Sequence, residues 1–203
     1  MELEKEAARY TGLYRTALRR NGIAGADHMA QEYAQRLAGM YASAEYAAHD
    51  IYPTINTALV YAVIAMCLQL KEAGQAKEQT IALVNDVFRE RKKLLGTLEK
   101  VIDVFPAAWP IAKKWNLADH ENRVKDGSIT YDFFTVGDNE ISYRISKCRY
   151  VEMFEQYGIR EYCKIFCMTD TQAYANLTRH VEFIRYEDLS DGGSCHDVVR
   201  RKR

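Results

Sequence analysis

The sequence lacks an excess of either charge. Its 203 residues include 28 Lys and Arg and 28 Asp and Glu, so the formal net charge is zero at neutral pH. A protein dedicated to nucleic acid needs a basic excess on one face, and an acidic disordered protein needs the opposite imbalance. The charge balance therefore argues against a nucleic-acid partner and against disorder. We interpret the basic end, 200–203, as a solvated terminus.

Long apolar runs and a secretion signal are also missing. The longest apolar run, from Ala58 to Leu68, is far shorter than the roughly 20 residues that a membrane-spanning helix needs. The N-terminal segment is charged and lacks the basic start and apolar core of a signal peptide. We therefore expect a soluble, cytoplasmic protein without a membrane partner. The five cysteines, an odd number, are then expected to be reduced thiols rather than a disulfide framework.

The first half of the chain has the hydrophobic spacing of helices. Apolar residues three and four apart predict a helix that ends near Arg20 and a second that Asp27 caps and Pro53 stops. A third helix, over roughly 54–71, is apolar on nearly every face, so we expect it to be buried, with Gly74 as its cap. We expect a fourth helix over about 76–105. It is followed by a short segment, 109–115, and by a polar stretch, 117–128. We assign residues 1–116 to a helical region.

The pattern changes to alternation after residue 128. Polar and apolar residues alternate over 129–133 and 141–145, on either side of a turn at 137–139, which predicts a β-hairpin. A helix over 149–157, a short helix around 162–166 and a capping box from Thr169 to Gln172 follow. Alternation resumes at 181–185 and at 195–201. This order predicts an α+β fold, in which the helical N-terminal half packs with a four-stranded antiparallel sheet in a module over 129–203, forming one compact unit.

Four of the five cysteines lie in this C-terminal module, at Cys148, Cys163, Cys167 and Cys195. The fifth, Cys67, lies in the apolar helix and is expected to behave as a small buried hydrophobe. Cys163 and Cys167 share a helical face because they are four residues apart. Packing in a core is the favoured interpretation of Cys163.

Two chemical roles for the thiols remain open beside packing. Cys163, Cys167 and Cys195 could bind zinc together with His196 or His180, although no Cys-x-x-Cys pair is present. Alternatively, a thiol near a helix terminus could be a nucleophile, and Cys167 lies close to the expected start of a helix.

The consecutive residues Cys195, His196 and Asp197 combine a thiol, an imidazole and a carboxylate. They cannot form a local triad, because alternate residues of a strand face opposite sides of the sheet. We expect Cys195 and Asp197 to share one face and His196 to lie on the other.

Two arginines and one aspartate could bind a small substrate. Arg185 and Arg144 lie in alternating strand patterns, where a guanidinium can hold a carboxylate through two hydrogen bonds. The competing interpretation is an exposed strand position paired with Glu182 or Glu187. For Asp170, the competing interpretation is a residue that only compensates a helix dipole.

Four segments together resemble the L-2-amino-thiazoline-4-carboxylic acid hydrolase family. They are residues 148–154 (CRYVEMF), 167–170 (CMTD), 183–185 (FIR) and 192–197 (GGSCHD). The resemblance covers roughly residues 140–198. One position departs from the family pattern, because the last cysteine is followed by His196, Asp197 and Val198 rather than by an aspartate and an aromatic residue.

The resemblance implies an α+β hydrolase that opens a small cyclic amidine or thiazoline ring bearing a carboxylate, without a cofactor. The reaction converts 2-aminothiazoline-4-carboxylate to N-carbamoyl-cysteine. Under this hypothesis Asp170 holds the protonated amidine or acts as a general base, and Arg185 binds the substrate carboxylate. Cys167 or Cys195 has a covalent or supporting role.

Arg144 and His196 are further candidates for substrate binding. The alternative hypothesis is a binding module without catalysis that senses a small molecule, a metal or oxidation. The apolar third helix could also support a homo-oligomer through the helical half.

Overall fold

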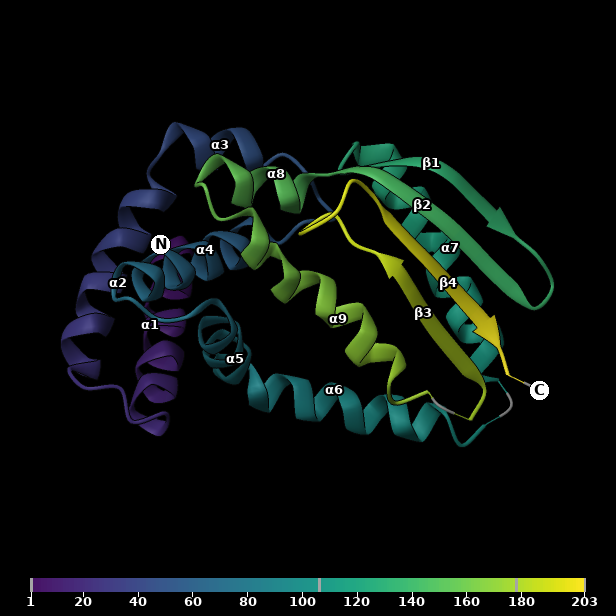
Figure 1. Cartoon of the computed structure of the whole chain (residues 1–203), viewed down its shortest axis with the longest axis horizontal. Helices are drawn as coiled ribbons and strands as arrows, with labels where there is room; N and C mark the ends of the chain where they lie inside the picture. The colour runs from purple at the N-terminus through teal and green to yellow at the C-terminus, as the bar shows by residue number, and fades with distance from the viewer. Residues whose placement is uncertain (1, 106, 178, 203) are drawn as a thin grey trace. The chain divides into compact units, whose positions relative to one another are not determined.

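The computed structural model describes residues 2–105, 107–177 and 179–202. The N-terminal half is helical and the C-terminal half contains a four-stranded antiparallel sheet, which confirms the α+β prediction (Figure 1). Contacts divide the chain into two compact units, residues 1–89 with 153–162 and residues 90–152 with 163–203. Within the described ranges, none of the helices combines the length and the hydropathy that crossing a bilayer requires.

The first unit is a helical bundle built around one apolar helix. Its helices are α1 Glu2–Arg20, α2 Ala26–Tyr41, α3 Ala44–His49, α4 Thr57–Glu72 and α5 Lys77–Val87. The predicted apolar helix is α4; it contacts α1, α2 and α5, and Cys67 within it is completely buried. Gly74 follows α4 with a φ of 77°, a conformation that a residue without a Cβ adopts at little cost.

Three helix limits in the N-terminal half differ from the prediction. Residues 27–52 form two helices rather than one, because the Ser43 hydroxyl accepts a hydrogen bond from the Tyr46 amide and starts α3 afresh. Asp27 is not the cap of α2, which begins after Gly25; its carboxylate instead accepts from Arg19, 2.6 Å away. The expected helix over 76–105 is divided at Phe88 into α5 and α6 Arg89–Ile102.

The second unit contains the sheet and the helices that cover one of its faces. Its helices are α6, α7 Ala108–Asp126 and α9 Lys164–Tyr174, together with the first half of α8, a helix that spans Arg149–Gln156. Its strands are β1 Ile129–Val136, β2 Glu140–Cys148, β3 Val181–Glu187 and β4 Cys195–Arg201. The second half of α8 and most of the short 3₁₀ helix Arg160–Cys163, which precedes α9, belong to the first unit. The predicted hairpin and the last two strands are confirmed. The strand order is β1-β2-β4-β3, so the C-terminal strand β4 lies inside the sheet (Figure 1).

Two helices of this unit extend beyond the segments that the sequence predicted. In the polar stretch 117–128, for which the sequence predicted no helix, α7 continues to Asp126 and ends before Gly127, whose φ is 73°. The capping box at Thr169 is also wrong, because α9 runs uninterrupted through this position. The Thr169 hydroxyl donates to the carbonyl of Phe166, a bond that a threonine makes inside a helix.

A small apolar cluster holds α7 and α9 against the same face of the sheet. It contains Trp109, Ala112, Ile141, Tyr174, Val181 and Val199. Asn116 of α7 also donates a hydrogen bond to the hydroxyl of Tyr174 on α9, at 2.6 Å. Apolar burial is non-directional, whereas this polar contact fixes how the two helices face each other. Beyond the cluster, aromatic rings, charged side chains and thiols line a space between the helices and the sheet.

Candidate active site

A cavity of about 140 Å³ lies between α7, α9 and the covered face of the sheet. A single water molecule needs roughly 10–15 Å³ of cavity volume. The cavity therefore suits a small molecule rather than a polymer. Aromatic rings form much of the wall of the cavity. Among the described residues, two arginines and three aspartates are the charged side chains that line it. The lining side chains used below are Asp119, Arg123, Tyr143, Cys148, Tyr150, Cys163, Cys167, Asp170, Tyr174, Arg185, Cys195 and Asp197.

The strand register places three polar side chains in one row across the sheet. Tyr143 of β2 lies opposite Asp197 of β4, which in turn lies opposite Arg185 of β3. Cys195 lies two residues before Asp197 and therefore on the same face, as the sequence predicts. Of the two residues that follow Cys195, only Asp197 lines the cavity.

Two of the predicted binding residues lie on the opposite face of the sheet. Arg144 stands between Tyr143 and Ile145, which both line the cavity, and its own side chain does not. His196 packs against Phe133, with ring centroids 5.8 Å apart. The structure therefore brings Cys167, Asp170, Cys195 and Arg185 together, but does not bring Arg144 or His196 to the same cavity.

Arg185 is the centre of a hydrogen-bonded network. Its Nε donates to Asp197 Oδ1 and its Nη2 to Asp197 Oδ2, both at 2.7 Å, which forms a bidentate pair. Nη2 also donates to Asp170 Oδ2 at 3.0 Å, and Nη1 donates to the carbonyl of Cys167. The Arg185 side chain is 15% exposed, so the competing interpretation of an exposed position paired with Glu182 or Glu187 is wrong.

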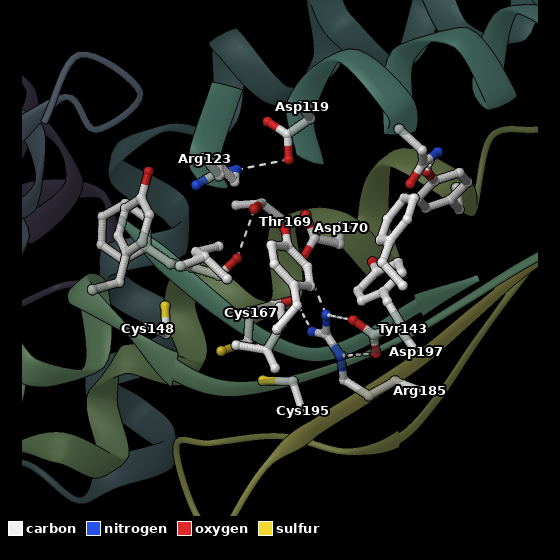
Figure 2. A pocket seen from close by; sticks show the side chains of 18 of the residues that line it. Asp119, Arg123, Tyr143, Cys148, Cys167, Thr169, Asp170, Arg185, Cys195 and Asp197 are labelled. Carbon is white, nitrogen blue, oxygen red and sulfur yellow. Dashed lines mark hydrogen bonds and ion pairs between the residues drawn. The ribbon is translucent and has the colours of Figure 1, made fainter. Parts of the chain in front are cut away.

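The two carboxylates of this network have different surroundings. Asp197 is 1% exposed and has both oxygens bound by Arg185. Asp170 is 44% exposed toward the cavity, and Arg185 binds only one of its oxygens; Oδ1 has no hydrogen-bond partner in the described part of the chain (Figure 2). Asp170 therefore has an oxygen that can accept a bond from a ligand.

Burial and charge act in opposite directions on these groups. Desolvation raises the pKa of Asp170 above its ordinary value, although the positive charge of Arg185 partly opposes this effect. For Arg185, burial alone would lower the pKa, but Asp197 and Asp170 outweigh it and hold the pKa above its usual range. Arg185 is consequently a permanent cation, and Asp170 is a carboxyl group that gains a proton more readily than a solvated one.

The four thiols of the module all line the cavity. Desolvation raises the pKa of Cys148 to about 11 and that of Cys195 to about 12, although the Leu189 amide donates to Cys195 Sγ at 3.2 Å. The pKa of Cys163 is also raised, by its hydrogen bond with Cys167 and by burial. Cys148, Cys163 and Cys195 are thus thiols rather than thiolates at neutral pH. Among the residues that the structure describes, no group of three or more His, Cys, Asp and Glu side chains is arranged to hold a metal ion.

Sequence reasoning missed the part of the site that α7 contributes. Asn116, Asp119 and Arg123 recur at three and four residues and share one face of this helix. The Nε of Arg123 donates to Asp119 Oδ2 at 2.6 Å. A signal was present, because an aspartate four residues before an arginine is a pairing typical of helices.

Comparison with known proteins identifies one family. A family model described as L-2-amino-thiazoline-4-carboxylic acid hydrolase matches residues 53–198. The match extends the resemblance seen in the C-terminal module back through α7, α6 and α5 to α4. None of the curated proteins matches the chain.

Proposed function

The chain belongs to the L-2-amino-thiazoline-4-carboxylic acid hydrolase family, and on this premise we propose that its cavity hydrolyses a small cyclic amidine bearing a carboxylate. The observation that carries the proposal is the position of Asp170. Its carboxylate is held by Arg185 through one oxygen and presents the other to a small cavity lined by aromatic rings and thiols.

The charges of the cavity suit a cationic group. Asp119 is paired with Arg123, and Asp197 is paired with Arg185. Asp170 is the remaining carboxylate, and it shares Arg185 with Asp197, so the five charged side chains leave one negative charge unmatched. A protonated amidine would neutralise this charge, and a carboxylate is the side chain best suited to hold it.

The reaction adds one water molecule to the ring. Asp170 accepts a proton from water as the water oxygen bonds to the amidine carbon, giving a tetrahedral intermediate. The carbon–sulfur bond then breaks, the electron pair leaves with sulfur, and the hydroxyl of the intermediate becomes a carbonyl. The protons balance when the leaving sulfur is protonated to a thiol. The sulfur needs little assistance from an acid to leave, because the pKa of a thiol is near 8.5.

The other lining residues support this step. Arg185 holds Asp170 and Asp197 in place. Cys195 is protonated at neutral pH, so in our proposal it has a supporting role and helps form the surface against which the ring sulfur packs. Cys167 lies one helical turn before Asp170 and lines the cavity beside it, so in our proposal it also has a supporting role.

The test is direct. Purified, reduced protein is incubated with 2-aminothiazoline-4-carboxylate, and products are followed by mass spectrometry. We expect a product heavier by one water that contains a free thiol, which a thiol reagent will trap. Recovery of unchanged ring at high enzyme concentration, with the protein folded, would reject this substrate class.

The pH dependence gives a second expected result. Asp170 must be unprotonated to accept a proton, and desolvation raises its pKa above the ordinary value. As the pH falls through this raised pKa, kcat/KM should therefore fall, with an inflection above the ordinary aspartate range near pH 4. A pH series of kcat/KM measures this limb in the free enzyme, the state to which the raised pKa applies. A kcat/KM that stays constant down to about pH 4 would remove Asp170 as the base.

A further inference from the structure

A second guanidinium in the cavity has no role in the reaction described above. Arg123 extends from α7, and its side chain is 19% exposed. Asp119, one turn earlier, accepts from its Nε at 2.6 Å, and the Tyr150 ring lies 5.9 Å from its guanidinium carbon. Burial alone would lower the pKa of Arg123, but Asp119 and the Tyr150 hydroxyl raise it above the usual value. Arg123 is therefore a permanent cation held in one orientation.

The two arginines differ in the number of N–H groups that remain available to a ligand. Four of the five N–H groups of Arg185 donate to Asp197, Asp170 and the Cys167 carbonyl. Arg123 donates its Nε to Asp119 and also interacts with the Tyr150 hydroxyl. Within the described residues, no carboxylate is bonded to its two terminal amino groups. Arg123 thus retains terminal N–H groups with which a guanidinium can bind a carboxylate.

From this difference we infer that Arg123, rather than Arg185, binds the carboxylate of the substrate. The inference rests on the proposed function, because it assumes that the ligand is a ring with both an amidine and a carboxylate. Figure 2 shows Arg123 and Asp119 on the α7 side of the cavity and Arg185 with Asp197 on the sheet side, with Asp170 between them in this view. The positive charge of Arg123 also reaches Asp170, where it favours the ionised carboxylate.

This placement assigns each charged group of the substrate to its own residue in the cavity. The ligand has its carboxylate at Arg123 and its amidinium at Asp170, so it is a small zwitterion with its charges at opposite ends. A ring without the carboxylate loses the contact with Arg123. The preference for a carboxylate then resides in one side chain of α7, outside the strands that hold Asp197 and Arg185.

The experiment compares two substrates across three variants. The substrates are 2-aminothiazoline-4-carboxylate and 2-aminothiazoline, which lacks the carboxylate. The variants are Arg123→Gln, Arg123→Lys and the control Lys125→Gln, which removes a positive charge from an exposed position of α7 outside the cavity. For each protein, kcat and KM are measured by product formation, and Kd is measured by calorimetry. Thermal unfolding verifies that each variant is folded.

We expect Arg123→Gln to raise KM for the carboxylate substrate by roughly 10- to 100-fold, because a charged hydrogen-bonded pair is lost. KM for 2-aminothiazoline should not change. Arg123→Lys keeps the charge without the two-pronged geometry, so it should show a smaller rise, again confined to the carboxylate substrate. Lys125→Gln should behave as the wild type. If Arg123→Gln does not fold, Arg123→Lys decides the question.

The outcomes separate this inference from the function on which it rests. Turnover by the wild type with an unchanged ratio of the two KM values in the Arg123 variants would overturn the role of Arg123 and leave the hydrolase standing. Binding of the carboxylate ring without turnover, weakened in Arg123→Gln, would support Arg123 and reject the reaction. Absence of both binding and turnover in the wild type would overturn both.

Discussion

Replacing Asp170 by asparagine should lower kcat by roughly two orders of magnitude or more, while the protein remains folded. Asparagine has nearly the same shape, and its carbonyl oxygen can still accept the hydrogen bond that Arg185 Nη2 donates to Asp170. The variant therefore removes the negative charge and the proton acceptor but keeps the position of the side chain. Single-turnover kinetics with 2-aminothiazoline-4-carboxylate would measure the chemical step directly.

A matched control separates the role of Asp170 from a general effect of charge. Asp191 is an exposed aspartate whose carboxylate binds Lys164 at 3.0 Å, and it does not line the cavity. Asp191→Asn changes the net charge by the same amount, and its kcat should equal that of the wild type. A kcat for Asp170→Asn within about twofold of the control would exclude Asp170 from the chemical step.

Replacing Arg185 by methionine should destabilise the protein by about 3–5 kcal/mol. The reason is the partner that this change leaves behind. Asp197 is 1% exposed, and Arg185 satisfies both of its oxygens. Without the guanidinium, a buried carboxylate must either remain charged without a partner or take up a proton. Asp170, which is open to the cavity, contributes less because water can solvate it. Urea-induced unfolding followed by circular dichroism would measure the loss.

A double variant tests this explanation. Arg185→Met combined with Asp197→Leu removes both charges and replaces them with apolar side chains. We expect it to recover most of the stability lost in Arg185→Met, because the cost comes from the unpaired charge and not from the missing contact. A loss below about 1 kcal/mol in the single variant would show that water reaches Asp197 after the change. Both variants should be inactive, since Arg185 also holds Asp170.

The sheet side of the site follows from the sequence to a large extent. Period-two alternation predicts both hairpin strands and the last two strands, and it places Cys195 and Asp197 on one face. It does not predict that Asp197 pairs with Arg185. That pairing needs the strand order β1-β2-β4-β3 and the register that sets Arg185 opposite Asp197, and both arise from tertiary packing.

The helical side of the site was missed for a physical reason. The part of α7 beyond Asn116 covers the polar end of the cavity, so it lacks the apolar stripe by which amphipathic helices are recognised. Asp119 and Arg123 of this part line the cavity, but in the sequence they resemble solvated polar residues. The misplaced helix start at Thr169 has a similar origin, because a capping pattern also occurs within a continuous helix.

The first compact unit is not continuous in the chain, and this affects how the protein is synthesised. Residues 153–162 belong to it although they are separated from residue 89 by α6, α7 and the β1–β2 hairpin. They supply Met153, Phe154 and Ile159, which are completely buried. On the ribosome, the first unit therefore cannot complete its core until residues 153–162 have emerged. During that interval the apolar surface of the N-terminal helices is exposed. The hairpin that contributes Tyr143 to the cavity is thus synthesised before the first unit is complete.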